Sequence, residues 1–448
     1  MGGMPGRDEG SDYAAANMSE RAADSGADKS LRGQSDPLPS VKQAVDRLGR
    51  LWLILILVAC VPVASWWVMR VVDAPANGWF QGQTTFAVGS DFSVFYTAGA
   101  LVREGESETL YDVESFRIEN AERTGWVLFQ ESPMFGNSPA FAVAVAPLTR
   151  MSWEAAWVVW TVLSLAALAV ALAGLGLRYV LFSIVFVLLT MPGYSAIIEG
   201  QSTMFWLLII AAIFVLLKRG SSTVAGVVAG LLILKPPLLI GFGLWWLIDR
   251  RMHRTLLVAA SSAVGIILLS VPFVGRAWLE YPMAVVRFGD LHRDAPGQQA
   301  QYSPWGFVDL LVSGYPGIAT AVGVVASIIG VAAFVVFFRR HRDEWRLLFA
   351  AAIIATLWIS PHILRYDWVL LVAPLAVIWH TRSYMWEAWL KASIVLAVVA
   401  LWSASITNLT IDSFGWAFQF AVPAFAAVAW YLAHELRATE PGEPARLN

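Results

Sequence analysis

Charged residues are scarce in this sequence. Only 14% of its 448 residues are Asp, Glu, Lys or Arg, whereas 58% are hydrophobic and the mean hydropathy is +0.61. Soluble domains average about 25% charged residues, and their surfaces need that polar cover. The composition therefore excludes a soluble enzyme and a disordered chain, and the net charge of −2 gives no global field for nucleic acid. It predicts an integral membrane protein with many spanning helices.

Cysteine is almost absent, and so are the common nucleotide and metal motifs. The single cysteine, Cys60, lies in an apolar run and is best explained as a small packed residue. It excludes an internal disulfide framework and a cysteine-built metal site. The sequence shows no Asp-x-Asp pair, no Walker motif and no zinc-ligand spacing. We therefore expect no cofactor and no metal.

Hydrophobic runs divide the chain. Residues 1–40 are rich in Gly, Ser, Asp, Ala and Arg and predict a disordered tail, and residues 436–448 form a second, shorter tail. The region between predicts an all-α polytopic membrane protein with about 11–12 transmembrane helices. Its expected spans are 51–69, 154–175, 179–197, 204–217, 223–248, 255–274, 316–338, 346–359, 368–379, 389–405 and 415–433. Lys235-Pro236-Pro237 interrupts the fifth run, which predicts two short helices broken there.

Lysine and arginine cluster on alternate connections, which predicts the orientation. By the positive-inside rule these connections are cytoplasmic, and so are both termini. The long acidic segment 73–150 is then extracytoplasmic. It contains a candidate amphipathic helix that opens at Asp91, which we expect to lie on the outer membrane surface. Residues 138–149 are apolar but too short to span, and predict a half-embedded or buried helix.

Polar residues within or beside the apolar runs gather on the predicted outer side. They are Asp91, Glu199, Gln201, Lys235, loop 287–303, His362, Arg365, Tyr366 and Asp367. Polar groups at membrane depth are costly, so they indicate function. A transporter would place such groups near the midplane. An outward-facing site under a large loop favours an enzyme acting on a lipid-linked substrate.

Several motifs resemble those of one enzyme family. They are Ser90-Asp91-Phe92-Ser93-Val94-Phe95-Tyr96-Thr97-Ala98-Gly99, Leu110-Tyr111, Pro139 with Ala146-Pro147-Leu148, Gly200-Gln201-Ser202, Leu234-Lys235-Pro236-Pro237, Gln301-Tyr302-Ser303-Pro304-Trp305-Gly306, and Ser360-Pro361-His362 with Tyr366-Asp367. Taken in order over residues 50–435, the set resembles glycosyltransferase family 87, also labelled DUF2029, of the GT-C membrane glycosyltransferases. The chain departs from the family pattern at Asn137-Ser138, Ser202-Thr203 and Gln301.

The resemblance implies an inverting transferase that uses a polyprenyl-phosphate-linked sugar, usually mannose. The acceptor would be a lipid or a cell-wall glycan at the outer face of the cytoplasmic membrane. Some relatives transfer arabinofuranose instead. The expected partners are therefore the donor, a glycolipid or glycan acceptor and membrane lipids, with no nucleic acid. The oligomeric state stays open.

The resemblance also suggests roles for single residues. A polyprenyl phosphate leaves as an anion and needs no acid, so one carboxylate suffices, and Asp91 matches the family's first-loop aspartate as the base. Lys235 or Arg365 would bind the departing phosphate, and His362 would bind phosphate or position the acceptor. Further substrate contacts are expected from Tyr96, Glu199, Gln201, Ser303, Tyr366 and Asp367.

Less specific explanations stay open at this point. Asp91 is also a suitable N-cap for a helix starting at Phe92, and Asp367 is suited to pair with Arg365 or cap the next span. Lys235 at a helix end is suited to snorkel. For the whole chain, the alternatives are a transporter or lipid flippase, and a non-catalytic membrane scaffold.

Overall fold

The computed structural model describes residues 51–438 except 53, 70–87, 125–134, 294–300, 313, 383–384 and 415–416. Regular structure in these residues is helical, and an isolated antiparallel bridge joins Gln301 to Leu364. The predicted tail 1–40 lies outside the described residues, as does 439–448. The all-α prediction is confirmed.

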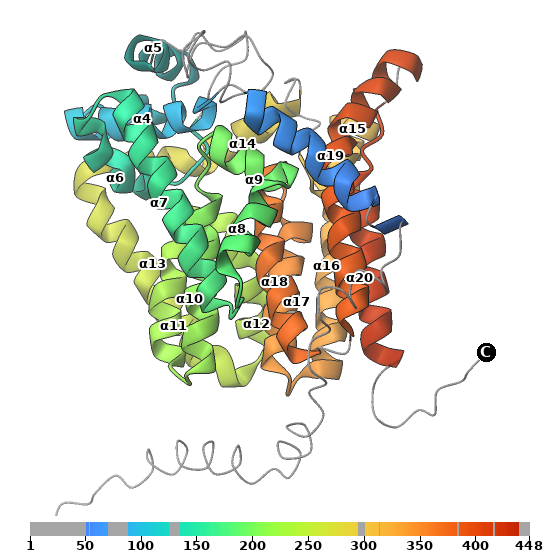
Figure 1. Cartoon of the computed structure of the whole chain (residues 1–448). Coiled ribbons are helices and arrows are strands. Elements are labelled where there is room, and N and C mark those ends of the chain that lie inside the picture. The colour runs from blue at the N-terminus through green and yellow to red at the C-terminus, as the bar shows by residue number, and fades with distance from the viewer. Residues whose placement is uncertain are drawn as a thin grey trace, which may run out of the picture.

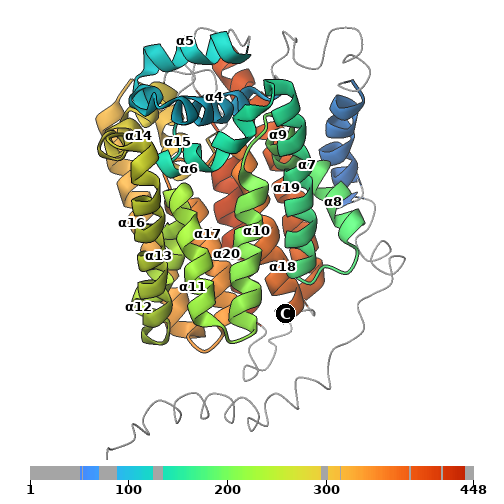
Figure 2. The same ribbon diagram turned by 90° about the vertical axis from the view of Figure 1, so that its left-hand side faces the viewer.

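Long and short helices run side by side to form a bundle (Figures 1 and 2). Its members are α7 (Trp153–Gly174), α10 (Thr203–Lys218), α11 (Ser222–Gly230), α12 (Ile240–Ile248), α13 (His253–Val274), α16 (Pro316–His341), α17 (Trp345–Ile359), α18 (Val372–Thr381), α19 (Trp386–Phe414) and α20 (Ala421–Ala438). In the described residues, Trp153–Gly174, Arg250–Val274 and Pro316–His341 are long and apolar enough to cross a membrane alone. Shorter apolar helices include Ile54–Met69 and Thr203–Lys218.

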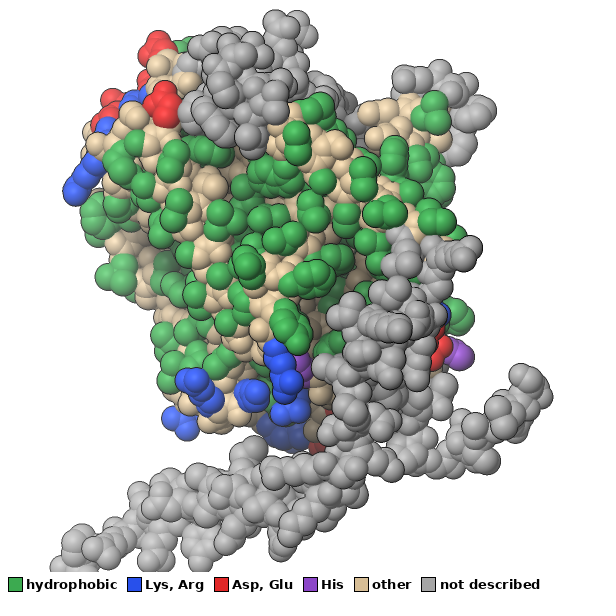
Figure 3. Space-filling view, viewed as in Figure 1, with side chains coloured by type: hydrophobic (Ala, Val, Ile, Leu, Met, Phe, Trp, Pro, Cys, Tyr) green, Lys and Arg blue, Asp and Glu red, His purple; other side chains and the backbone are tan. Residues whose placement is uncertain are grey.

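The outer surface of this bundle is apolar. Leu269 on α13 is 76% exposed and Ile328 on α16 is 61% exposed. Figure 3 shows hydrophobic side chains over the middle of the molecule, with Lys and Arg at the lower end. Such a surface is stable against lipid rather than water. The chain is a polytopic membrane protein.

A group of shorter elements, which we call the cap, covers one end of the bundle (Figure 2). It consists of α4 (Ser90–Glu104), η1 (Ser107–Tyr111), α5 (Val113–Thr124), α6 (Pro139–Val145) and η2 (Ala146–Arg150). Further elements near this end are α14 (Ala277–Arg293) and α15 (Pro304–Leu311) (Figure 1). As predicted, α6 is largely buried.

Helix α4 differs from the expected amphipathic surface helix. It is buried continuously from Phe92 to Val102. A Cβ atom on Gly99 would stand 3.0 Å from the Ala146 backbone nitrogen, so the absent side chain lets η2 approach closely. Helix α4 is therefore an internal element of the cap, packed against α5, α6 and η2.

The expected span 179–197 is sharply bent. The chain forms α8 (Val180–Leu188) and α9 (Met191–Ile198), which meet at 84°. Thr190 caps α9 by accepting from the Gly193 N–H at 3.4 Å, and Pro192 suits a helix start. A Cβ on Gly193 would stand 2.1 Å from the Val187 carbonyl oxygen, so the corner needs glycine. The bend turns α9 inward, where every residue is buried.

The predicted break at Lys235 is confirmed. Lys235 separates η3 (Leu231–Leu234) from η4 (Pro236–Leu239), so α11 and α12 are distinct short helices. Pro236 lacks an N–H and disfavours the α conformation at Lys235, which has φ −134° and ψ 78°.

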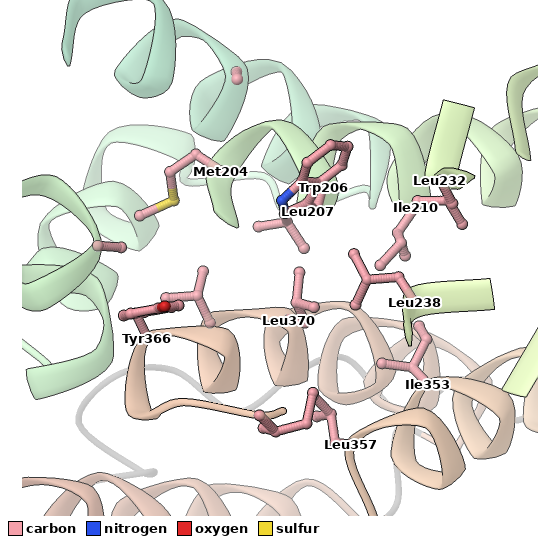
Figure 4. Packing of buried hydrophobic residues seen from close by; sticks show 14 of the residues in the cluster. Met204, Trp206, Leu207, Ile210, Leu232, Leu238, Ile353, Leu357, Tyr366 and Leu370 are labelled. Carbon is pink, nitrogen blue, oxygen red and sulfur yellow. The ribbon is translucent and has the colours of Figure 1, made fainter. Parts of the chain in front are cut away.

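Buried apolar side chains hold these short elements together (Figure 4). Those from α10, η3 and η4 face those from α17 and from η7 (Arg365–Leu371). The labelled set is Met204, Trp206, Leu207, Ile210, Leu232, Leu238, Ile353, Leu357, Tyr366 and Leu370, all buried in the main core. The segments that carry the polar residues described next therefore share one packed interior.

Candidate active site

A tight turn after α9 fixes the start of α4. The Glu199 carbonyl oxygen accepts from the N–H groups of Asp91 at 2.9 Å and Phe92 at 3.0 Å. Gly200 has φ +76°, and a Cβ there would stand 2.5 Å from the Phe92 Cβ. The Trp160 Nε1–H donates to the Gly200 carbonyl at 2.9 Å. Glycine is therefore required both for the conformation and for the close approach.

The Asp91 carboxylate accepts a hydrogen bond from the Gln201 side-chain amide. It does not cap α4, because the N-cap position is Gly89 and no side chain bonds there. Burial, and next the charge of Glu199, raise the pKa of Asp91 to about 7, against the lowering effects of Gln201, Arg365 and Lys235. A carboxyl with this pKa exchanges a proton readily near neutral pH, as a general base must.

Glu199 and Arg365 form a buried ion pair with a serine. Arg365 Nη2 lies 2.5 Å from Glu199 Oε1, and Arg365 Nε donates to Ser195 Oγ at 2.9 Å. The Ser195 hydroxyl in turn donates to Glu199. Ser195 was not among the predicted site residues, although it stands one helical turn before Glu199 on the same face of α9.

Lys235 pairs with Asp367 across the break. Lys235 Nζ lies 2.6 Å from Asp367 Oδ1, and the side chains are 13% and 0% exposed. Asp367 Oδ2 also accepts from the Leu364 N–H at 3.2 Å. Lys235 Nζ lies 5.6 Å from the centre of the Tyr366 ring. Asp367 thus caps η7, which was one of the two less specific explanations for this residue. The cation that pairs with it is Lys235 and not Arg365.

Most of the predicted site residues therefore lie together. The charges of Glu199, Arg365 and Lys235 all act on Asp91, and those of Asp91, Glu199, Asp367 and Arg365 act on Tyr366. We call this set the polar cluster: Asp91, Ser195, Glu199, Gln201, Lys235, Arg365, Tyr366 and Asp367. It unites the start of α4, the end of α9, the break before η4 and the start of η7.

Three predicted residues have other positions. The Tyr96 hydroxyl donates to the Met151 carbonyl at 2.8 Å, so it faces the cap and not the polar cluster. Ser303 caps α15 by accepting from the Gly306 N–H, and donates to the Pro361 carbonyl at 3.2 Å. His362 lies in the short loop before Arg365, where its N–H donates to Ser360 Oγ at 3.4 Å.

Loop 360–364 is tied to the start of α15. The Tyr302 N–H donates to the Ile363 carbonyl at 2.7 Å, next to the bridge between Gln301 and Leu364. These bonds hold the loop before Arg365 against the segment that leads into α15. Within the described residues, no group of three His, Cys, Asp or Glu is arranged to hold a metal ion.

An all-α membrane bundle with a buried acid–base cluster under a cap is typical of a membrane enzyme. Comparison with known families identifies which one. The model of glycosyltransferase family 87 matches residues 135–361, about half of the chain. The chain belongs to glycosyltransferase family 87, and it is a glycosyltransferase. Glu199, Gln201 and Lys235 lie inside the matched segment, whereas Asp91 and Arg365 lie outside it. No curated protein and no solved structure matches the chain.

Proposed function

We propose that the chain transfers mannose from a polyprenyl-phosphate donor to a lipid or cell-wall glycan acceptor at the outer face of the cytoplasmic membrane. The observation that carries this proposal is the Asp91 carboxyl, which lies within electrostatic range of Lys235 and Arg365 and has its pKa raised to about 7. A base and two cations suit displacement of an anionic phosphate by a hydroxyl.

The reaction is a single displacement. Asp91 takes the proton from the acceptor hydroxyl, whose oxygen attacks the anomeric carbon of the sugar. The bond from that carbon to the phosphate oxygen breaks, and the electron pair leaves with the polyprenyl phosphate. Because the attack comes from the face opposite the leaving group, the anomeric configuration inverts. Lys235 and Arg365 stabilise the phosphate as its charge develops.

The neighbouring residues prepare these groups. Gln201 donates to Asp91 and so fixes the orientation of the carboxylate that receives the proton. Glu199 and Asp367 hold Arg365 and Lys235 in place until the donor phosphate takes over the contacts. His362, two residues after Ser360 and close in sequence to Arg365, positions the acceptor or the phosphate. Tyr366 adds to the substrate surface, and Ser303 supports it from behind by bonding the Pro361 carbonyl in the loop that carries His362.

The charge distribution supports the orientation that this function needs. Figure 3 shows Lys and Arg side chains without Asp or Glu over much of the lower end, and Lys and Arg mixed with Asp and Glu at the upper end. Figure 1 places α4 and α9, which carry Asp91 and lead to Glu199, at the upper end. By the positive-inside rule the lower end is cytoplasmic. The polar cluster and the cap then face outward, and both termini are cytoplasmic.

The decisive variant is Asp91→Asn, assayed in membranes supplied with polyprenyl-phosphate-linked mannose. The amide keeps the size of the side chain but accepts no proton, so we expect transfer to fall by at least 100-fold while donor binding persists. The matched control is Asp112→Asn, since Asp112 is an exposed cap carboxylate that bonds the Ser115 N–H.

Near wild-type turnover in the Asp91 variant would remove this residue as the base. Polyprenyl-phosphate-linked arabinofuranose is assayed in parallel, and preference for it would replace mannose as the sugar. Substrate flux without transfer in reconstituted vesicles would instead support the transporter alternative.

A further inference from the structure

A group of basic side chains converges at the end of the bundle opposite the polar cluster. Arg178 follows α7, Lys218 ends α10, Arg346 is the second residue of α17, and His380 lies in the last turn of α18. All are exposed. Helix α10 starts beside Gln201, and its 16 residues place Lys218 about 24 Å away. We call these residues the basic patch.

Specific contacts bring the patch together. The His380 ring donates a hydrogen bond to the Gly176 backbone carbonyl, and a Cβ on Gly176 would stand 3.2 Å from His380 Nε2. Lys218, Arg178 and Arg346 all lie close enough for their charges to act on this ring. The histidine therefore lies within electrostatic range of three cations from neighbouring segments.

Aromatic packing connects α10 to α17 at the same place. The rings of Phe214 and Trp345 are 5.6 Å apart, and the Arg346 guanidinium lies 5.6 Å from the Trp345 ring. Phe214 precedes Lys218 by one helical turn and shares its face of α10. Lys218 and Arg346 are consequently carried by two packed helices.

Some basic residues at this end have acidic partners, whereas Arg178, Lys218 and Arg346 have none among the described residues. Arg251 pairs with Asp249 and Asp343, and Arg382 pairs with Glu344. Within the described part of the chain, no carboxylate lies within ion-pair distance of Arg178, Lys218 or Arg346. Like charges that converge without a counter-ion repel one another, which favours the binding of an anion.

An apolar surface continues from the patch. Directly after Arg178, Tyr179 is 78% exposed, Leu181 is 76% exposed and Phe182 is 71% exposed. In a membrane protein, such side chains at the start of α8 contact lipid tails. A ligand that fits both surfaces carries a phosphate next to acyl chains.

We propose that the basic patch binds the phosphate headgroup of an anionic phospholipid, with the acyl chains along α8. Basic pockets between transmembrane helices bind such headgroups, and each nearby Lys or Arg strengthens the attraction. One bound lipid would connect α10 and α18, and both helices adjoin the polar cluster at their other ends. Helix α10 begins next to Gln201, and α18 follows η7. The site is independent of the proposed sugar-transfer chemistry.

The test uses the full chain, purified in detergent and stripped of lipid, and titrated with phosphatidylglycerol or phosphatidylcholine of the same acyl composition. Binding is counted by native mass spectrometry. We expect the anionic lipid to bind more tightly, and Lys218→Gln with Arg346→Gln to weaken it by roughly tenfold or more. The matched control, Arg250→Gln with Arg254→Gln, removes the same charge from exposed sites at the same end.

Equal binding of the two lipids would overturn the proposal, as would an equal loss in both double variants. Displacement of the lipid by equimolar inorganic phosphate would show that the site takes free phosphate and would likewise overturn it. If the variant Lys218→Gln with Arg346→Gln does not fold, the test uses Arg178→Gln, which lies in the connection between α7 and α8. An intact affinity in that variant would count against the proposal.

Discussion

The ion pair between Lys235 and Asp367 allows a stringent test of the site. Asp367 is 0% exposed and Lys235 is 13% exposed, with 2.6 Å between the charged atoms. Lys235→Met removes the cation and leaves the carboxylate buried without a counter-charge. Breaking a buried pair in this way costs about 3–5 kcal/mol. We therefore expect a large fall in the free energy of unfolding, together with loss of transfer.

The double variant Lys235→Met with Asp367→Leu separates the two effects. Replacing a whole buried pair by apolar residues is often neutral or stabilising. The Leu364 N–H loses its acceptor at 3.2 Å, which costs about 1–3 kcal/mol. We expect the double variant to recover most of the lost stability. Transfer should stay lost, because no ammonium group remains for the phosphate.

Unfolding is measured as an equilibrium titration in mixed detergent micelles, and transfer is measured in membranes. The control is Lys391→Met, which breaks the partly exposed pair with Glu387 at 2.6 Å and should cost less than about 1 kcal/mol. Recovery of transfer in the double variant would refute the proposed role of Lys235 in phosphate binding. Unchanged stability in the single variant would refute the cost assigned to the buried charge.

Two further predictions concern the turn at residues 199–201. Transfer should decline as the pH falls below about 7, because the carboxylate must be ionised to act as a base. Gln201→Leu should shift this decline to higher pH, because the lost hydrogen bond lowers the pKa of Asp91 in the native protein. A pH profile of kcat/KM that is the same in the variant would count against the contact between Gln201 and Asp91. Gly200→Ala should impair both folding and transfer, because the new Cβ would meet Phe92 at 2.5 Å in a left-handed conformation; wild-type melting and turnover would contradict the geometry.

Much of this architecture could be predicted because the membrane limits the choices. Apolar runs marked most helices, and a lysine followed by two prolines marked the break at Lys235. Since charge is so scarce, the remaining polar residues near the predicted outer ends identified most of the polar cluster. The sequence did not indicate which partners pair. Lys235 and Asp367 are 132 positions apart, and Arg365 and Glu199 are 166 apart.

The differences between the expected and the observed arrangement have physical causes. The corner at Thr190 depends on a glycine that fits against the Val187 carbonyl, and hydropathy averaged over an apolar run does not detect it. Helix α4 is buried on all sides, and both polar and apolar residues lie on each side. The helical period of its apolar residues therefore could not indicate which face packs against the protein. Tyr96 shares the motif of Asp91 but points to Met151, because i and i+5 lie on different faces of a helix.

Under the proposed function, the balance of charge in the polar cluster explains how a phosphate site and a base can occupy the same place. Lys235 and Arg365 alone would lower the pKa of Asp91 and weaken it as a base. Burial and the Glu199 carboxylate act in the opposite direction and keep that pKa at about 7. Asp367 neutralises Lys235 at the same time. Under the proposed function, these added carboxylates offset the cations that the leaving group needs. The cations can then stabilise the phosphate without making the neighbouring carboxylate too weak to accept a proton.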